Sequence, residues 1–552
     1  MPQPSHAHEL ARSLMPQLCE RDDFDEFLIW PPDLFALTSL LLAKSGAHTY
    51  VTNPHAGNLE AVHTRAANAV AIGQTWRSQL DDVDSFDVLA DHPRTKPLSR
   101  GHVQQLLNNT PAEVKNAWGP FLQSWSGLNP NLVHTDGLQD LHDDKHAQDV
   151  GHLLFLHAVA DAACEDVLTH TASKFLQTCK ARLFRDGTLS FCDPSRVVVL
   201  PKQHTPQVGL SLRSISLNLA FHQRPAASQW LGNTDTDARR QLRLLLFPWP
   251  FVIRCGEFSP GQAIDKHHRF FCYAQNATAD HEAFHRLNHI IAAAKKELGG
   301  DELIDMLIMP ESSLDKSSHV YLHNTLKNTG IRSYVCGLRE CKPDTLGANF
   351  LQIAVRTPWA DEFAVQHKHH RWRLDGGQAY RYALGRSLSP DIVWWEGIAI
   401  PPRTVSFVDI GNGMVITPLI CEDLARQDPV APLVRAVGPS LVVALLMDGP
   451  QLRSRWSAYY ATVLADDPGS SVLTLTSKGM VDRWRSPYDH WKRIVALWKD
   501  RDGPARELDL GDSDALLLNV DVVERGEWSA DGRKAIRHEL LLRESVNINA
   551  EM

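Results

Sequence analysis

Short apolar runs alternate with amphipathic stretches through the second half of the chain, and this alternation limits the folds open to it. Examples of the runs are LRLLLF at 242–247, VITPLI at 415–420 and SLVVALL at 440–446. Between such runs, the segment 281–298 places Phe284, Leu287 and Ile291 on one face of a helix. Alternating strands and helices, with several direct strand-to-strand steps, predict an α/β layered sandwich.

The first half of the chain has a mostly helical pattern. The segment 31–46 begins with two prolines and ends at a glycine, as helices do. The segment 146–168 is apolar almost all round, which predicts a buried helix. We therefore expect a mostly helical N-terminal domain over 1–190, a β-containing connector over 191–240 and an α/β domain over 241–527. The last segment, 528–552, is expected to be a charged tail with one short helix.

Composition excludes several classes of protein. The 56 Lys and Arg against 65 Asp and Glu give a net charge of −9, which argues against a chain-wide nucleic-acid surface or a polybasic membrane surface. No apolar run approaches the roughly 20 residues of a membrane-spanning helix, and the N-terminus lacks a signal-peptide pattern. The 9 cysteines are scattered without a CxxC pair, which is typical of a reducing compartment. We expect a cytoplasmic protein with no membrane partner.

Three residues with complementary chemistry follow predicted strands. Cys421 comes after VITPLI, Glu311 after LIMP, and Lys368 after FAVQH. Chain segments that end strands at one edge of a sheet converge in space, so we expect these three side chains to meet. Cys421 precedes a helical turn, whose positive end would favour its thiolate.

The three side chains suit the cleavage of a C–N bond. Glu311 would take the proton of the Cys421 thiol, and later that of a water molecule. Lys368 would hold the oxyanion of a tetrahedral intermediate, and the backbone N–H of Glu422 would give a second oxyanion contact.

The motifs PE at 310–311, Lys368, WWE at 394–396 and ICED at 420–423 resemble the nitrilase, or carbon–nitrogen hydrolase, superfamily. The resemblance covers about 241–527 and implies an α-β-β-α sandwich and a homo-oligomer. It also implies Glu396 as a second active-site glutamate. The implied substrate is a small-molecule amide or nitrile, and the implied chemistry needs no metal and no organic cofactor.

Simpler interpretations exist for each residue. A single cysteine after a strand is more often a small buried hydrophobic residue, and the order Glu, Lys, Cys is what favours catalysis here. Lys368 also fits an exposed position among neighbouring histidines, and Glu396 fits a cap beside two tryptophans. The extra segment 373–391 is expected to form a lid or a substrate wall. A metal site is disfavoured, because no cysteine or carboxylate pattern completes the set His142, His146, His152, His157 and Asp161.

Two functions therefore remain. The first is a thiol-dependent hydrolase of non-peptide amide, nitrile or carbamoyl C–N bonds. The second is a partner-gated or non-catalytic module whose N-terminal half binds a protein or nucleic acid. The segment ICEDLARQDP at 420–429 also resembles nitrilase-like domains that accompany bacterial reverse transcriptases in antiviral defence, which suits the second function.

Overall fold

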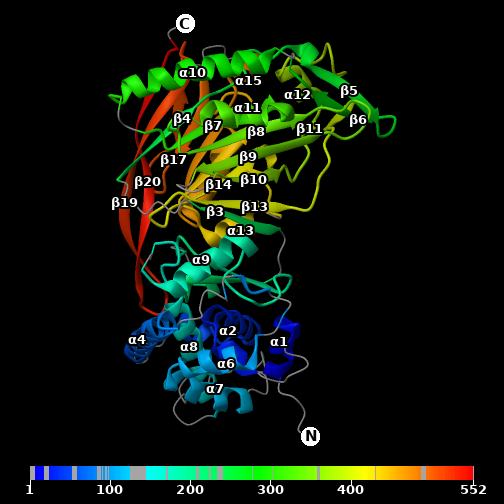
Figure 1. Ribbon diagram of the computed structural model, residues 1–552. Coiled ribbons are helices and arrows are strands. Elements are labelled where there is room, and N and C mark those ends of the chain that lie inside the picture. Colours follow the sequence, from blue (N-terminus) through cyan, green and yellow to red (C-terminus); the bar gives the residue numbers. More distant parts are fainter. Residues whose placement is uncertain are drawn as a thin grey trace. The chain divides into compact units, whose positions relative to one another are not determined.

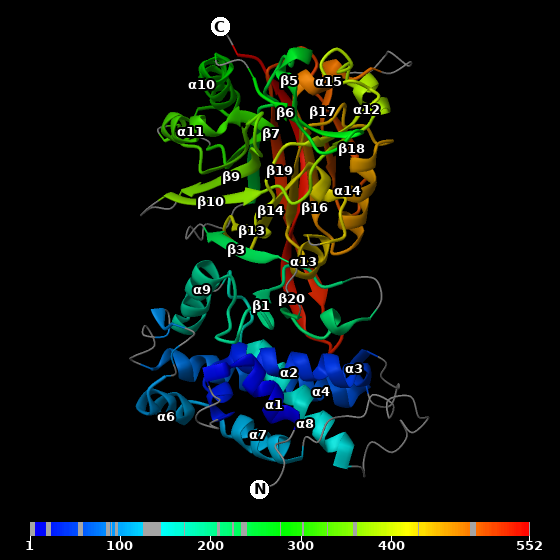
Figure 2. The same ribbon diagram turned by 90° about the vertical axis from the view of Figure 1, so that its right-hand side faces the viewer.

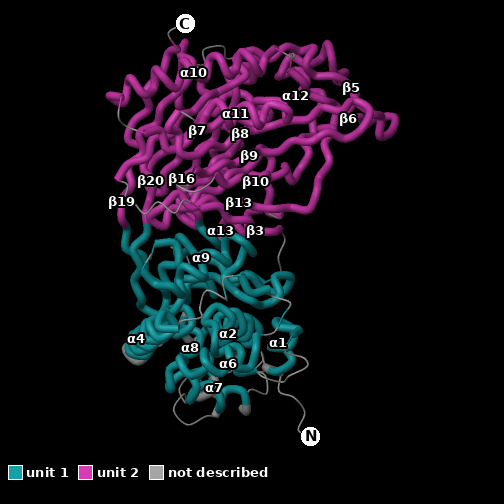
Figure 3. The backbone as a smooth tube through the Cα atoms, in the orientation of Figure 1, with its two compact units in different colours: residues 1–224, 436–438, 525–537 teal, residues 225–435, 439–524, 538–552 magenta. Residues whose placement is uncertain are grey.

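The computed structural model divides the chain into two compact units (Figure 3). Unit 1 comprises 1–224, 436–438 and 525–537, and unit 2 comprises 225–435, 439–524 and 538–552. The residues that the structure describes are 6–17, 24–52, 59–83, 89, 91–93, 96, 98–124, 145–169, 172–206, 210–222, 226–232, 240–275, 278–300, 303–327, 329–356, 361–428, 430–485 and 493–550.

Unit 1 is organised around helix α8 (Lys145–Ala163), which contacts α2 (Pro31–Ser45), α4 (Leu59–Asp81) and α7 (Ala112–Ser124). Helices α4 and α8 come very close, since a Cβ on Gly73 would lie 2.6 Å from the carbonyl oxygen of Val159. The remaining elements of unit 1 are α1 (His6–Leu14), η2 (Phe24–Leu28), α3 (Thr49–Thr52), α6 (Arg100–Asn108), α9 (Lys174–Asp186), β1 (Val197–Pro201), η5 (Leu212–Ser214) and β2 (Asn218–His222). Strands β1 and β2 pair antiparallel.

Buried charges join distant parts of the chain within unit 1. The turn between β19 (Ala515–Trp528) and β20 (Lys534–Ile548) belongs to this unit and carries Arg533. The Arg533 guanidinium donates to Asp161 at 2.5 Å and to Glu165 at 2.8 Å. Burial alone would raise the pKa of Asp161, but Arg533, His157 and the hydrogen bonds from Leu217 and Asn218 together more than offset this, and the pKa lies below its ordinary value. Asp161, one of the residues weighed as a metal ligand, therefore serves as the partner of Arg533.

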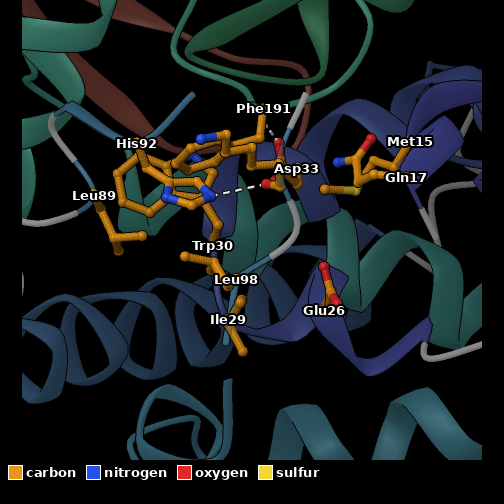
Figure 4. A pocket seen from close by; sticks show the side chains of 11 residues that line it. Met15, Gln17, Glu26, Ile29, Trp30, Asp33, Leu89, His92, Leu98 and Phe191 are labelled. Atoms are coloured by element: carbon orange, nitrogen blue, oxygen red, sulfur yellow. Dashed lines mark hydrogen bonds between the residues drawn. The ribbon is translucent and has the colours of Figure 1, made fainter. Parts of the chain in front are cut away.

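Unit 1 also contains a cavity of about 370 Å³ near the start of α2 (Figure 4). Trp30, Asp33 and Phe191 are among the residues that line it. Asp33 is almost fully buried, and burial raises its pKa to about 6. Its Oδ1 accepts hydrogen bonds from the Ser190 hydroxyl at 2.6 Å and the Phe191 N–H at 2.7 Å. This carboxylate thus fixes the turn after α9.

Unit 2 contains two seven-stranded sheets. The first has the order β10-β9-β8-β7-β4-β19-β20, with β4 (Gln241–Leu246), β7 (Met306–Asp315), β8 (Ser333–Glu340), β9 (Ala348–Arg356) and β10 (Asp361–His367). The second has the order β18-β17-β16-β15-β14-β13-β3, with β3 (Ala227–Gly232), β13 (Thr404–Asp409), β14 (Val415–Ile420), β15 (Leu441–Leu446), β16 (Ser471–Thr476), β17 (Ile494–Lys499) and β18 (Arg506–Asp509). The strands predicted at 415–420 and 440–446 are confirmed as β14 and β15.

The sheets of unit 2 pack face to face, with helices on their outer faces (Figures 1 and 2). Strands β15 and β16 contact β7 across the interface. Helices α10 (Ala279–Glu297) and α11 (His319–Leu326) cover the first sheet, where Phe284 and Leu287 join Leu307 in one buried cluster. Helix α14 (Trp456–Asp466) contacts β16 and β17 of the second sheet. The unit is a mixed α/β structure with a helix–sheet–sheet–helix order.

A smaller sheet of order β11-β12-β6-β5 adjoins these layers. Its strands are β5 (Phe258–Ala263), β6 (His268–Tyr273), β11 (Arg373–Leu374) and β12 (Val393–Glu396). The extra segment 373–391 supplies β11 and α12 (Gly376–Arg381). Its residues Leu374, Tyr382 and Leu388 pack in one buried cluster with Trp394 and Met447, so the segment forms a packed wall. The other short helices are η6 (Cys255–Glu257), η7 (Lys316–Ser318), η8 (Cys421–Leu424), α13 (Val430–Val437) and α15 (Lys478–Arg483).

The C-terminal segment differs from the expectation. Residues 534–548 were expected in a charged tail with a short helix, and they form the strand β20 beside β19. Leu540 and Leu542 are buried while Arg543 and Glu544 are exposed, so pairing in the sheet overrides the local charge pattern. Of the helices that the structure describes, none is long and apolar enough to cross a membrane.

Candidate active site

The sequence pattern predicted Glu311 at the end of a strand, but the residue lies inside strand β7. The pairing of β7 with β8 is interrupted between Met309 and Leu314, and Ser312 has a φ of 55°. A bulge of this kind aims a side chain away from the regular ladder. On the neighbouring strand β8, a Cβ on Gly337 would lie 2.6 Å from the Cα of Glu311. The bulge therefore fits only beside a glycine.

Lys368 directly follows β10 and bridges two glutamates. Its ammonium group lies 2.7 Å from Oε1 of Glu311 and 2.7 Å from Oε2 of Glu396. The lysine is 1% exposed, so it does not occupy the solvated position that its neighbours would allow. Glu396, the last residue of β12, also accepts a hydrogen bond from the backbone N–H of Trp372 at 3.0 Å. Its carboxylate thus contacts Lys368 and does not cap a helix.

Asn349, on β9, joins the same group and was not singled out from the sequence. Its Nδ2 donates to Glu311 at 2.8 Å and to Glu396 at 2.6 Å. The residue is 3% exposed. A signal for it existed in the sequence, because an asparagine within the buried run ANFLQIAV needs a hydrogen-bond partner.

The charges of this group shift one another's titration. Burial alone would lower the pKa of Lys368, but Glu311 and Glu396 hold it well above its ordinary value. Burial raises the pKa of Glu311, Glu396 adds to the rise, and Lys368 opposes it. Oε1 of Glu311 accepts from Lys368 and Asn349, whereas its buried Oε2 has no hydrogen-bond partner among the described residues. Oε2 is therefore the atom of Glu311 that can accept a proton.

Cys421 follows strand β14 and has a φ of 46°, an uncommon conformation for a residue with a side chain. Its thiol is in electrostatic range of both Glu311 and Lys368. Burial and the charge of Glu311 raise the pKa of this thiol well above its ordinary value, although Lys368 lowers it. The expectation of a helix-stabilised thiolate is wrong, because η8 is a single 3₁₀ turn and too short for a helix dipole.

The two residues after Cys421 have different roles in the fold. The Glu422 side chain is partly exposed and pairs with Arg426 at 3.0 Å. Asp423 is buried and accepts from the backbone N–H of His369 at 3.1 Å. It also lies 2.9 Å from Nδ1 of His370. Asp423, which was not singled out from the sequence, thereby ties the segment after Lys368 to the turn that carries Cys421.

A pocket that is partly open to solvent, with about 370 Å³ of empty space, adjoins these groups. Ser312, Asn349 and Glu396 line one part of it, and Trp372 and Met447 line another. The remaining lining residues are Phe271, Cys272, Tyr273, Arg339, Glu340, Cys341, Ala348, Gly397 and Ile398. In the described part of the chain, no three or more His, Cys, Asp or Glu side chains are grouped so that they could hold a metal ion. His142 and the side chain of His146 lie outside the described residues.

Comparisons with known proteins gave structural matches only. No family model matches the chain, and no curated protein matches it. An amidase from Nesterenkonia sp. is similar over 51% of this chain and 91% of its own, at 13% identity and a TM-score of 0.31. A double mutant of the amidase from Nesterenkonia sp. AN1, in complex with acrylamide, is similar over 52% of this chain and 93% of its own, at 12% identity and a TM-score of 0.32. TM-scores of this size leave the geometry of the site as the ground for assigning a function.

Proposed function

We propose that unit 2 is a carbon–nitrogen hydrolase of the nitrilase superfamily, acting on a small-molecule amide, nitrile or carbamoyl compound. The observation that carries the proposal is the buried Lys368 ammonium held between Glu311 and Glu396, with the thiol of Cys421 in electrostatic range. Buried charges are costly unless they pair, and a buried thiol beside such a group is typical of catalytic sites.

With an amide substrate, the Cys421 sulfur attacks the carbonyl carbon in the first step while its proton passes to Glu311. The raised pKa of Cys421 means that the resting group is a thiol, so the reaction needs this base. Glu311 Oε2 is available for the proton, because the hydrogen bonds of this carboxylate fall on Oε1. The proton then moves to the leaving amine, which departs and leaves a thioester on Cys421.

In the second step, water cleaves the thioester. Glu311 takes a proton from the water, and the resulting tetrahedral carbon releases the acid and restores the thiol. Lys368 has three N–H bonds and uses two of them on glutamates, so the third is available to the oxyanion in both steps. The backbone N–H of Glu422 supplies the second donor.

A panel of short aliphatic amides, nitriles and carbamoyl compounds tests the proposal. We expect ammonia release by the wild-type protein, and a substrate-derived mass increase on the peptide that contains Cys421. Cys421→Ser should lose both signals. Cys255→Ser is the matched control, because Cys255 is a partly exposed thiol of unit 2 outside this group. If turnover persists in Cys421→Ser, the proposal is wrong. No contact described above favours the partner-gated module, which stays a prediction.

A further inference from the structure

We propose that the substrate of this site carries a carboxylate, which Arg339 binds within the cavity. This inference rests on the proposed function and names its substrate class. Arg339 lies on β8, is 5% exposed, and lines the cavity together with Asn349 and Glu396. Among the residues that line the cavity, it is the one Lys or Arg side chain.

The guanidinium of Arg339 has N–H donors that make no hydrogen bond within the described part of the chain. Its Nη1 donates to the carbonyl oxygen of Ser312 at 2.8 Å, and its Nη2 donates to Oε1 of Gln275 at 3.3 Å. Its Nε is buried and has no hydrogen-bond partner in the described part of the chain. A guanidinium has five N–H donors in a planar fork, and this arrangement matches a carboxylate.

No described carboxylate lies within 4.0 Å of Arg339, and this sets it apart from the other charges around the cavity. Glu396 is paired with Lys368, and Glu340 lies 3.1 Å from Lys342. A buried cation that has lost its hydration without gaining a counter-charge is costly, and an anionic ligand would remove that cost. A cationic side chain that lines a reaction cavity without a paired carboxylate is typical of a group that binds an anionic substrate.

Tyr273 offers a second donor beside Arg339. The guanidinium centre lies 5.2 Å from the centre of the Tyr273 ring, and both residues line the cavity. Gln275 donates to the Tyr273 oxygen at 2.9 Å, so the phenol's own hydrogen remains for an acceptor. Burial raises the pKa of Tyr273, which keeps the phenol protonated at neutral pH. Arg339 and Tyr273 together form a binding site for one carboxylate.

Matched pairs of amides test the inference directly. Succinamate, glutaramate and adipamate carry a terminal carboxylate, and butyramide, valeramide and hexanamide are their neutral counterparts. We expect at least one anionic amide to exceed its neutral counterpart in kcat/KM by about 30-fold, the size typical of a hydrogen bond to a charged group. Arg339→Gln should remove this preference, because it should lower kcat/KM for the anionic amide much more than for the neutral amide. Arg339→Lys, which keeps the charge but not the fork, should fall between the two.

Arg356→Gln is the matched control, because Arg356 is a partly buried arginine at the far end of β9 that does not line the cavity. It should retain the preference for anionic amides. Equal kcat/KM for the two series in the wild-type protein overturns the inference while the proposed function stands. An equal loss on both series in a folded Arg339→Gln protein also overturns it, because Arg339 would then act on the structure of the site.

A binding measurement covers the case in which no amide is hydrolysed. Succinate and glutarate should slow the alkylation of Cys421 by iodoacetamide in the wild-type protein and not in Arg339→Gln. Protection of Cys421 by a dicarboxylate supports the carboxylate-binding site even where the proposed function has failed. If neither dicarboxylate protects Cys421 and no anionic amide is preferred, the inference is overturned.

Discussion

At the scale of single residues, Lys368 balances the negative charges of Glu311 and Glu396 in the site. It is the one cation within 4.0 Å of both Glu311 and Glu396 among the described residues. Replacing it with methionine leaves the buried Glu311 carboxylate and the partly buried Glu396 carboxylate without their shared cation. Removing one partner of a buried ion pair typically costs about 3–5 kcal/mol. We expect Lys368→Met to lower the free energy of unfolding at pH 7 by that amount, as measured by urea denaturation.

The pH dependence of the stability of Lys368→Met follows from the direction in which the pKa of Glu311 changes. The pKa of Glu311 is already raised in the folded protein, and loss of Lys368 raises it further. A carboxylate with a raised folded pKa binds protons more readily in the folded state, so folding gains stability as the pH falls. Lys368→Met should therefore regain part of its loss as the pH falls from neutral toward the ordinary pKa of a glutamate. Lys342→Met, at a half-exposed lysine that pairs with Glu340, should change stability by less than about 1 kcal/mol.

The titration of Cys421 gives a second residue-scale prediction. The negative charge of Glu311 raises the pKa of this thiol, and Lys368 lowers it. Glu311→Gln removes the negative charge and keeps the positive one, so the thiolate should form at lower pH. We expect the alkylation of Cys421 at pH 7 to become faster in Glu311→Gln while amide turnover is lost.

Peptide mass spectrometry across a pH series measures this titration. The control is Glu340→Gln, because Glu340 is a glutamate at the end of β8 that pairs with surface lysines. It should leave the midpoint of Cys421 alkylation unchanged. An upward shift of the midpoint in Glu311→Gln would contradict the electrostatic account.

At the scale of elements, the irregular part of β7 depends on its neighbour β8. A Cβ on Gly337 would lie 2.3 Å from the carbonyl oxygen of Pro310, so the bulge would have to move. Overpacking of this kind typically costs about 1–3 kcal/mol. We expect Gly337→Ala to lower the free energy of unfolding by that amount and to displace Glu311, with kcat falling more than KM changes.

The control for this prediction is Gly385→Ala, where an added Cβ would meet nothing within 4 Å. Its stability should stay within about 0.5 kcal/mol of the wild-type protein. Wild-type kcat in a folded Gly337→Ala protein would show that Glu311 does not depend on this contact.

At the scale of the whole molecule, Arg533 links the end of the chain to helix α8 within unit 1. Its partner Asp161 lies 372 positions away in the sequence. Arg533→Met leaves Asp161 buried without its cation, and we expect a loss of about 3–5 kcal/mol at neutral pH. The pKa of Asp161 is lowered in the folded protein, so its contribution is present at neutral pH and is lost as the pH falls through the folded pKa.

Alkylation of Cys164 reports on this part of unit 1, because that thiol is buried next to the end of α8. We expect it to react much faster in Arg533→Met than in the wild-type protein. Arg403→Met, at a partly exposed arginine 3.6 Å from Asp428, should leave the rate unchanged. Unchanged protection of Cys164 in Arg533→Met would show that the ion pair does not hold this helix.

The sequence by itself determined the local elements. The apolar runs 415–420 and 440–446 fall in strands, and the periodic segment 281–298 falls in a helix, because a short continuous apolar run and a one-sided apolar face each leave a local pattern. The chain order of Glu311, Lys368 and Cys421 could also be read directly from the sequence, whereas the position of Glu311 inside its strand could not.

Only the tertiary structure decided how these residues are held. Asn349 contacts Glu311 and Glu396 because the register of β7, β8 and β9 brings it there, and no local pattern encodes a register between strands. The bulge at Glu311 and the strand β20 likewise depend on neighbouring strands. Whether the Arg339 guanidinium has an ion-pair partner depends on which carboxylates the fold brings close to it. These features are contacts between distant residues, and the sequence alone cannot place them.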